Sequence, residues 1–320
     1  MKQLSCVVIG LGAIGMGYDF NDNEQILTHA CAINSHPGFA LASAVDPCNK
    51  RRTLFESRYN IKAYESIKDI PLDSKIEVFA VCTPTSLHLS SIEEIVNKFS
   101  PLAVLCEKPL AHSYDEAYVF FSELNALAST KIYVNYIRRS DYSAYIISQL
   151  IQNEDPDFIT KGHCYYTKGA LNNASHFLNL LESWFGTATL KALSPHYPCE
   201  VEGDFNVDFI ADFDKASIVF QSGVESVYSL YQFQLYLSSG VLSYANGGKD
   251  IFYLSREFIP DSPTPYCKPW QRIPSNLDKY QYHIYDELFK ALNEQHSMLS
   301  TKADALRTLK ALSTLKSHSS

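Results

Sequence analysis

The fold of this chain is decided by one stretch near its amino terminus, Ser5-Cys6-Val7-Val8-Ile9-Gly10-Leu11-Gly12-Ala13-Ile14-Gly15. Its apolar first half is typical of a buried strand, which runs directly into a Gly-x-Gly-x-x-Gly pattern. Gly10 permits the tight turn out of the strand, Gly12 lets the backbone approach a pyrophosphate, and Gly15 allows close helix–strand packing. The amides that open the next helix, at Ala13 and Ile14, would face the phosphates at the positive end of the helix dipole. The stretch therefore predicts a dinucleotide-binding turn.

A second apolar run, residues 39–45, ends in Asp46. A carboxylate at this place accepts a hydrogen bond from a ribose 2′-hydroxyl, which predicts NAD, although Lys50 and Arg51 nearby leave NADP possible. The gap from Gly15 to Asp46 is 31 residues (46 − 15), against the usual gap of about 20. The excess lies in residues 17–27, which are polar and rich in turn formers. We interpret them as an inserted loop before a helix capped by Thr28, either a surface insertion or a flap beside the nicotinamide or the substrate.

Strands and helices alternate over the rest of residues 1–138. Buried strands are predicted at about 77–82, 102–106 and 131–136, with helices between them. This order predicts a Rossmann domain with a parallel, doubly wound sheet. Polar motifs follow the strands at the edge where such sheets bind ligands; they are Thr83-Pro84, Glu107-Lys108-Pro109 and Arg138-Arg139.

The second part, residues 139–320, has a different pattern. Aromatic-rich runs alternate polar and apolar residues, which indicates an open, mostly antiparallel sheet with one covered face. The runs are 205–213, 216–221, 226–237, 241–244 and 251–254. Helices are expected at about 142–152, 174–185, 277–295 and 301–316, with a Pro-rich loop at 259–274. We predict an α+β domain for substrate binding and oligomerisation.

Composition excludes several classes of protein. The chain has 320 residues, 46% of them hydrophobic and 19% charged, and a net charge of −8, which argues against nucleic acid or an anionic membrane as partner. It has no apolar run of the length that spans a bilayer. Eight cysteines are scattered without a Cys-x-x-Cys pair. They are typical of a reduced, cytoplasmic protein and indicate neither a disulfide framework nor a metal site.

On these motifs the chain resembles the glucose–fructose oxidoreductase / inositol dehydrogenase / MocA family of NAD(P)-dependent oxidoreductases. The resemblance covers nearly the whole length and is carried by Gly10-x-Gly12-x-x-Gly15, Asp46, Thr83-Pro84-x-x-x-His88, Glu107-Lys108-Pro109 and the segment 169–179 around His176. It implies cofactor contacts from these motifs, namely Gly10, Gly12, Ala13, Ile14, Gly15, Asp46, Thr83, Pro84, His88, Glu107 and Lys108.

The resemblance also implies a chemistry. It places Lys108 at the nicotinamide, where it assists hydride transfer at a sugar or cyclitol carbon, and it makes His176 an acid/base. The chemistry of the residues supports part of this assignment. Oxidation of an alcohol needs a base for the hydroxyl proton, and a lysine beside a cationic nicotinamide has a pKa lowered toward that task. The chain departs from the family pattern at Asn172 and Asn179, where aspartates are common, and at Ala174, where glycine is.

The expected catalytic residues are thus Lys108, His176 and Asn172, and the expected substrate contacts are Asn135, Arg138 and Asn179. Isolated histidines such as His29 and His163 are more typical of structural roles.

We predict a cytoplasmic oxidoreductase that acts on a sugar-like hydroxyl or ketone, free, cyclitol or nucleotide-linked, and that forms a homodimer or homotetramer through the open sheet. One alternative is a cofactor-binding sensor with weakened catalysis, favoured by the two asparagines. A further alternative is a redox-assisted glycosidase.

Overall fold

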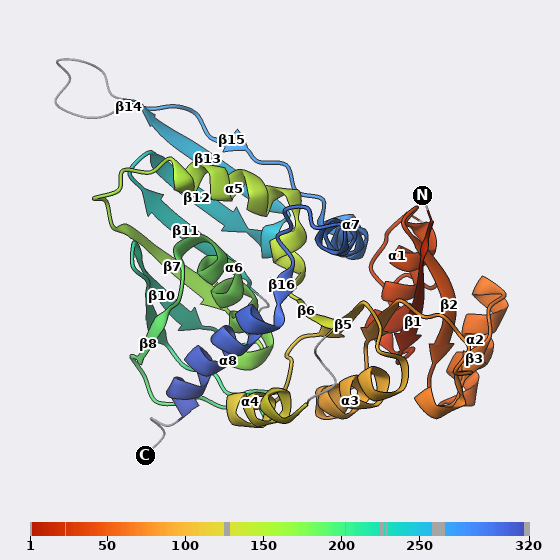
Figure 1. Ribbon diagram of the computed structural model, residues 1–320. Helices are drawn as coiled ribbons and strands as arrows, with labels where there is room; N and C mark the ends of the chain where they lie inside the picture. The colour runs from red at the N-terminus through yellow and green to blue at the C-terminus, as the bar shows by residue number, and fades with distance from the viewer. Residues whose placement is uncertain are drawn as a thin grey trace. The chain divides into compact units, whose positions relative to one another are not determined.

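The computed structural model of the chain, drawn in Figure 1, describes residues 2–22, 24–124, 129–201, 203–224, 227, 230–257 and 266–316. Contacts divide the chain into two units. The first comprises Met1–Ser140 and Asp278–Leu306, and the second comprises Asp141–Leu277 and Arg307–Ser320. The predicted domains are 1–138 and 139–320, so the prediction assigns the segment 278–306 to the second domain, whereas in the structure it belongs to the first unit. That segment groups with the first unit because its helix packs beside the first helix of the chain and its short strand joins the first sheet.

The first unit contains a seven-stranded sheet, which is parallel except at one edge. Its strand order is β16-β6-β5-β4-β1-β2-β3. The strands are β1 (Leu4–Ile9), β2 (Phe39–Val45), β3 (Ala63–Tyr64), β4 (Val78–Val81), β5 (Ala103–Glu107), β6 (Lys131–Asn135) and the antiparallel β16 (Ser300–Thr301). The helices are α1 (His29–Ser35), α2 (Asn49–Tyr59), α3 (His88–Phe99), α4 (Tyr114–Glu123) and α7 (Tyr280–Leu292). The predicted Rossmann sheet is confirmed. The helix predicted between the strands at 102–106 and 131–136 is α4, described to Glu123, and residues 125–128 lie outside the described part.

The central strands are apolar along their whole length because both faces of the sheet are covered. All four residues of β4 and the first four of β5 are fully buried. A parallel sheet covered on both faces requires this continuous apolar pattern rather than alternation. The predicted cap of α1 is also confirmed, since the Thr28 side chain accepts from the Cys31 amide.

The strand order places the ligand-binding edge. The direction of the order reverses between β1 and β4, because the chain builds β1-β2-β3 to one side and β4-β5-β6 to the other. Ligands of open α/β sheets bind outside the carboxyl ends of the strands at such a reversal. The loops after β1, β4 and β5 therefore meet at this edge.

The second unit contains a nine-stranded sheet in which neighbours are antiparallel except for the β7–β10 pair. Its order is β14-β13-β12-β11-β7-β10-β9-β8, with β15 beside β13. The strands are β7 (Thr160–Tyr166), β8 (Thr189–Ala192), β9 (Phe209–Asp212), β10 (Ala216–Ser222), β11 (Gln232–Leu237), β12 (Gly240–Ala245), β13 (Asp250–Glu257), β14 (Tyr266–Cys267) and β15 (Gln271–Arg272). The helices are α5 (Tyr142–Gln152), α6 (Ser175–Phe185) and most of α8 (Lys302–Lys316), which begins in the first unit.

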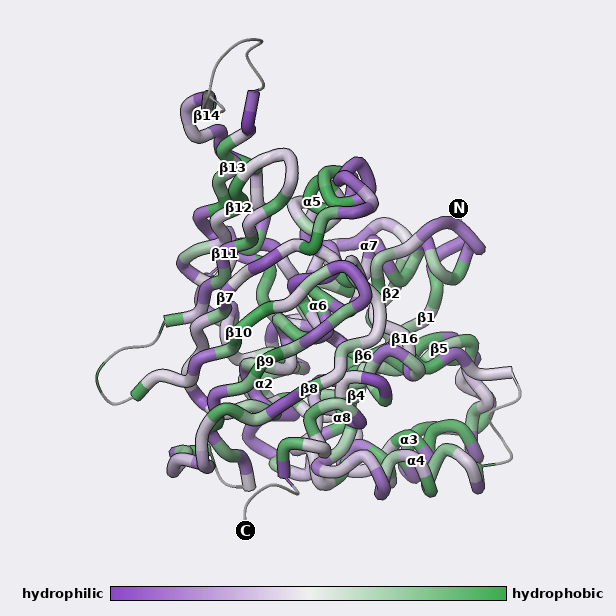
Figure 2. The backbone as a smooth tube through the Cα atoms, turned by 90° about the vertical axis from the view of Figure 1, so that its left-hand side faces the viewer, coloured by the Kyte–Doolittle hydropathy of each residue, from purple (hydrophilic) through white to green (hydrophobic). Residues whose placement is uncertain are grey.

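One face of this second sheet is covered and the other is not. Phe220, Cys164, Phe233, Tyr244 and Ile251 form a buried row across five strands. The ring of Phe177 on α6 packs on this face, 5.2 Å from the Phe233 ring and 5.7 Å from the Tyr244 ring. Burial accordingly alternates from one residue to the next along β11 and β12, and Figure 2 shows hydrophobic and hydrophilic residues along the same strands. The predicted open, mostly antiparallel sheet is confirmed.

The residues that alternate with this buried row define what we call the open row: His163, Val219, Gln234, Ser243 and Phe252. All of them are half-buried. Among the helices described, none has both the length and the apolar character that a bilayer crossing requires.

Candidate functional site

The turn after β1 has the backbone geometry that its glycines allow. Gly10 has a φ of +97°, and a Cβ there would lie 2.8 Å from the Cys82 carbonyl oxygen. Gly15 lies against Gly10, since a Cβ on Gly15 would be 3.0 Å from the Gly10 carbonyl carbon and closer still to its oxygen. Gly12 has nothing within 4 Å of the position of a Cβ. The π-helical turn Ala13–Gly17 follows at once.

This edge fits a dinucleotide. The open space over Gly12 lies beside the first amides of the π-helical turn, which have no acceptor within that turn. Thr83 follows β4, the neighbour of β1, and among the described residues its buried Oγ1 has no hydrogen-bond partner. An open approach to backbone amides and a buried hydroxyl without a partner are what a phosphate-bearing ligand uses. Gly12, Ala13 and Ile14 would hold the pyrophosphate, with Thr83 and Pro84 lining the same edge.

Asp46, the expected ribose acceptor, also holds the glycine turn. Its side chain is buried, Oδ2 accepts from the Leu11 amide at 2.8 Å, and Oδ1 accepts from the Cys48 amide at 2.8 Å. Arg51 Nη1 lies 3.5 Å from Oδ2. An ionised carboxylate offers about four acceptor positions, so these contacts leave capacity for a ribose hydroxyl. Asp46 thus holds the glycine turn in place through these bonds, independently of any hydrogen bond to the ribose.

We expect the protein to bind NADH more tightly than NADPH, by about 1–3 kcal/mol, because a 2′-hydroxyl can donate to the Asp46 carboxylate whereas a 2′-phosphate is repelled by it. Arg51 is the cation beside this carboxylate and is half exposed, so Arg51→Ala should widen the preference. Fluorescence titration of NADH and NADPH, with the parent protein and with Arg51→Ala, measures this difference in affinity. NADPH binding as tight as NADH binding would contradict this role of Asp46.

The Glu107-Lys108-Pro109 turn after β5 is held by His88. His88 is buried; its Nδ1 lies 2.9 Å from the Pro109 carbonyl oxygen and its Nε2 lies 2.9 Å from the Thr83 carbonyl oxygen. Burial lowers the pKa of His88, against the two carbonyl contacts, which raise it. This predicted cofactor residue therefore bridges the loops after β4 and β5. Lys108 itself is partly exposed.

Glu107 is the centre of a buried polar network that sequence reasoning missed. Its Oε1 accepts from Asn135 Nδ2 at 2.6 Å and lies 2.8 Å from His29 Nε2. Burial alone would raise the pKa of Glu107, but the hydrogen bond and charge of His29, followed by Asn135 and Lys108, hold it below its ordinary value. Glu107 is thereby kept as a carboxylate next to Lys108 in the chain.

The network continues into α7. His29 Nδ1 lies 2.8 Å from the Tyr285 hydroxyl, and Asn135 Nδ2 also donates to Gln281 Oε1 at 3.1 Å. His29, Asn135, Gln281 and Tyr285 are all fully buried. Asn135 was expected to contact substrate; in the structure its amide supports Glu107, and a substrate contact stays a prediction. The one sequence signal for His29 is its place directly after the helix cap, at the start of α1.

The predicted insertion, residues 17–27, closes on itself at its base and joins α7. Apart from residue 23 it is described. Buried Asp19 accepts from the Thr28 amide at 2.9 Å and from its hydroxyl at 2.6 Å. The Ile26 amide donates to the Asp278 carbonyl at 3.2 Å, and the Gln281 amide donates to the Ile26 carbonyl at 3.3 Å. The insertion thus supports the helix whose side chains reach Glu107; action as a flap stays a prediction.

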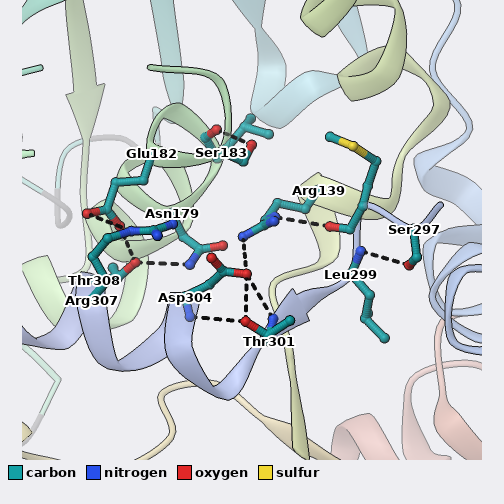
Figure 3. Close-up of polar contacts among 12 residues, drawn as sticks. Arg139, Asn179, Glu182, Ser183, Ser297, Leu299, Thr301, Asp304, Arg307 and Thr308 are labelled. Atoms are coloured by element: carbon teal, nitrogen blue, oxygen red, sulfur yellow. Dashed lines mark hydrogen bonds and ion pairs between the residues drawn. The ribbon is translucent and has the colours of Figure 1, made fainter. Parts of the chain in front are cut away.

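The two arginines after β6 have different surroundings. Arg139 is buried; its Nε donates to the Met298 carbonyl at 3.0 Å and its Nη1 lies 3.2 Å from Asp304 Oδ2 (Figure 3). Asp304, in the first turn of α8, also accepts from the Thr301 amide and hydroxyl, at 3.0 and 2.9 Å, and its own amide donates to Thr301 Oγ1 at 3.2 Å, so the two residues form a capping box. Arg139 is therefore structural. Arg138, the expected substrate contact, is half-buried.

In the second unit, His176 lies on the first turn of α6 and is 6% exposed. The π-helical turn Ala170–Ala174 precedes it. Asp204 Oδ1 accepts from the Leu171 amide at 2.9 Å, and Oδ2 accepts from the Asn172 amide at 2.8 Å. The Asn172 side chain donates to the Lys168 carbonyl at 3.2 Å. Burial raises the pKa of Asp204 more than these backbone bonds lower it.

Asn179 lies three residues after His176 on α6 and is fully buried. Its Nδ2 donates to Thr308 Oγ1 at 2.9 Å, and that hydroxyl donates to Glu182 Oε2 at 2.5 Å (Figure 3). Arg307 Nε lies 3.6 Å from Glu182 Oε1. This chain joins α6 to α8, so the amide of Asn179 has a helix-packing role; contact with substrate stays a prediction.

Comparisons with known proteins agree with this fold. No curated protein sequence matches the chain. An oxidoreductase from Agrobacterium radiobacter, solved with NAD+, L-tartaric acid and magnesium, is 15% identical with a TM-score of 0.74, over 99% of this chain and 96% of that one. The WlbA dehydrogenase from Bordetella pertussis, solved with NADH and UDP-GlcNAcA, is 13% identical with a TM-score of 0.75, over 99% of this chain and 96% of that one.

At these identities the two solved structures show the fold alone. Residues 4–132 match the model of the oxidoreductase family with an NAD-binding Rossmann fold. The match covers the glycine turn, Asp46, the loop after β4 and the Glu107-Lys108-Pro109 turn. Over these residues the chain is similar to that family, the glucose–fructose oxidoreductase / inositol dehydrogenase / MocA oxidoreductases.

Proposed function

We propose that this protein is an NAD-dependent oxidoreductase that transfers a hydride between the nicotinamide and the carbon of a sugar-like hydroxyl or ketone. The observation that carries the proposal is the Glu107-Lys108-Pro109 turn. It lies at the carboxyl end of β5, beside the loops that fit a dinucleotide, and it is held by His88 and by the network around Glu107. The nicotinamide, when bound, gives or accepts the hydride; the protein must bind, orient and move the proton.

Lys108 is the residue proposed to move that proton. It is partly exposed, so a substrate can reach it, and the residue before it is a largely buried carboxylate held in place. A lysine acts as a general acid or base when its surroundings bring its pKa near the working pH. The positive charge of an oxidised nicotinamide lowers the pKa of Lys108, and the negative charge of Glu107 raises it.

His176 is proposed as a second acid/base, in the second unit. Its support is its place at the start of α6, directly after a turn whose amides are fixed by Asp204. The ring of Tyr231 lies edge-on, 6.4 Å from the ring of His176. The carboxylate that the family pattern has four residues earlier is replaced by Asn172, which points its amide at a backbone carbonyl.

The substrate proposed is a polyhydroxylated or sugar acid, free or nucleotide-linked. The two similar structures were solved with L-tartaric acid and with UDP-GlcNAcA, both of which carry hydroxyl and carboxylate groups. Arg138, after β6, is the residue proposed to meet the negative charge. Anaerobic mixing of the protein and NAD+ with glucose, myo-inositol, L-tartrate or UDP-GlcNAcA, followed by NADH absorbance, tests this; cofactor binding without reduction by any of them would count against it.

A cofactor-binding sensor is the second candidate. It is favoured by one observation, the neutral Asn172 amide where the family has a carboxylate. A sensor would bind NADH and the same sugar-like ligands without exchanging hydride between them.

We also propose that the protein forms a homo-oligomer through the open sheet and works in the cytoplasm. The open row is half-buried and carries Val219 and Phe252 beside polar residues, and Tyr236 on the same face is 42% exposed. Such a face is typical of an interface. All eight cysteines are free thiols, as expected in a reducing compartment.

Val219→Glu should convert the oligomer to monomers, because it places a charge in the middle of the open row with no partner. Tyr118→Glu, on exposed α4 of the first unit, is the control and should leave the mass unchanged. Sedimentation equilibrium measures the mass of the parent protein and of both variants. A parent protein that is monomeric at micromolar concentration, or a Val219→Glu protein of unchanged mass, would refute the interface.

A further inference from the structure

We infer that His29 is a positioning residue for the proposed reaction: with Tyr285 behind it, it keeps Glu107 ionised and fixed, so that Glu107 sets the protonation of Lys108. This inference rests on the proposed role of Lys108. It adds to that role two residues outside the Glu-Lys-Pro motif, His29 and Tyr285, that affect the protonation of Lys108.

The first step is the orientation of the His29 ring. Nε2 lies 2.8 Å from Glu107 Oε1, and Nδ1 lies 2.8 Å from the Tyr285 hydroxyl. Glu107 has a lowered pKa and is a carboxylate, which only accepts hydrogen bonds, so Nε2 carries a proton. Burial raises the pKa of Tyr285 far above its ordinary value, so its hydroxyl stays protonated; it donates to Nδ1 of a neutral imidazole and accepts from Nδ1 of an imidazolium. In both protonation states Nε2 donates to Glu107 and Tyr285 holds the other nitrogen of the ring.

The second step is the cost of losing this donor. Burial is the largest influence on Glu107 and disfavours the carboxylate; the bond and charge of His29 are the largest opposing influences. The Glu107 side chain is only 13% exposed, and a largely buried carboxyl group without such partners titrates above its ordinary range. Without His29, Glu107 should therefore take up a proton near neutral pH, although Asn135 still donates to it.

The third step is the effect on Lys108. An ionised Glu107 favours the ammonium form of Lys108, and the two charges interact, since Lys108 lowers the pKa of Glu107. A neutral Glu107 no longer does so, and the amine form of Lys108 becomes more abundant. Among the described residues, five further titratable groups interact with Glu107: Cys82, Cys106, Tyr280, Tyr285 and His88. Burial raises the pKa of the thiols and phenols and lowers the pKa of the histidine, so these groups are neutral or carry little charge near pH 7.

The chain offers a matched control at the other end of the same helix. His36 caps the carboxyl end of α1, is 4% exposed, and has its nearest carboxylate, Asp286 Oδ1, at 3.8 Å. Its Nδ1 accepts from the Gly38 amide at 3.1 Å. Replacement of His36 by leucine also removes a buried imidazole from α1, but it leaves the Glu107 network intact.

The test measures the amine form of Lys108 directly, in the protein without substrate. Acetic anhydride labels the amine form of lysine, and mass spectrometry of the peptide that contains Lys108 gives the labelling rate from pH 6 to pH 9. His29→Leu should move the rate profile of Lys108 to lower pH and raise its rate at pH 7 several-fold. His29→Gln, whose amide can still donate to Glu107, should restore much of the parent profile. His36→Leu should leave it unchanged.

A double-mutant comparison with Glu107→Gln isolates the cause. In the parent, Glu107→Gln should raise the labelling rate as much as His29→Leu does; in the His29→Leu background it should add less than about twofold, because the charge is already lost. Tyr285→Phe, which removes a single oxygen, serves if His29→Leu does not fold, and should shift the profile in the same direction. Parent-like profiles for His29→Leu or Tyr285→Phe, or full additivity with Glu107→Gln, would overturn the inference. If these shifts occur while Lys108→Ala keeps its turnover, the proposed function fails and the inference about the network stands.

Discussion

Replacing Lys108 by alanine is expected to lower turnover by about 10²–10⁴-fold, the usual contribution of a positioned acid or base, while NADH affinity stays within a few fold. The side chain is proposed to act on the proton that moves in the chemical step, and an interaction made only in that step lowers kcat rather than binding. Cofactor titration and steady-state kinetics on the same preparation separate the two effects.

The matched control is Lys131→Ala. Lys131 begins β6, so it lies at the amino-terminal edge of the sheet, opposite to Glu107 and Asn135. It is exposed, and its loss should leave kcat, KM and cofactor affinity unchanged. Turnover that persists in Lys108→Ala, or that falls equally in Lys131→Ala, would show that the Glu-Lys-Pro turn is structural in this protein.

The second large effect is expected at Gly15. A methyl group there would overlap the Gly10 carbonyl group, which is backbone and cannot move aside as a side chain can. Gly10 is itself fixed, because its amide donates to the Val45 carbonyl at 2.7 Å. We expect Gly15→Ala to lower the free energy of unfolding by about 1–3 kcal/mol, the usual cost of overpacking, and to abolish measurable NADH binding. Urea unfolding and fluorescence titration measure these two quantities.

Gly12→Ala should separate stability from binding. Nothing lies within 4 Å of a Cβ on Gly12, and its φ of −71° suits any residue. Stability should therefore change little, whereas NADH affinity should fall at least tenfold if the pyrophosphate approaches the backbone at this point. If Gly12→Ala binds NADH as the parent does, the phosphate path described here is wrong.

The sequence was sufficient to predict the parallel sheet because its strongest signals are local. The run before Gly10 and the four apolar residues of β4 are strands buried on both faces, and such strands are recognisable in isolation. The glycine pattern places the ligand edge for the same reason, since Gly10 needs a left-handed φ that few other residues adopt.

The Glu107 network could not be predicted in this way. His29 and Tyr285 are separated by 256 positions and touch only because α7 packs beside α1. Nothing near Asn135 distinguishes an amide that supports Glu107 from one that meets a substrate. The return of residues 278–306 to the first unit depends on a strand of two residues, Ser300–Thr301, which is too short to leave a periodic signal.

Transfer of deuterium from the cofactor is the most direct test of the central claim, that this chain performs hydride transfer. The protein is loaded with NADH deuterated at the reacting carbon of the nicotinamide and mixed with the keto form of each sugar acid or cyclitol tested, and the product is analysed by mass spectrometry. We predict that at least one product gains a single deuterium at the former carbonyl carbon, and that Lys108→Ala loses this transfer. A protein that binds NADH and these compounds but never moves deuterium between them would contradict the account and favour the sensor.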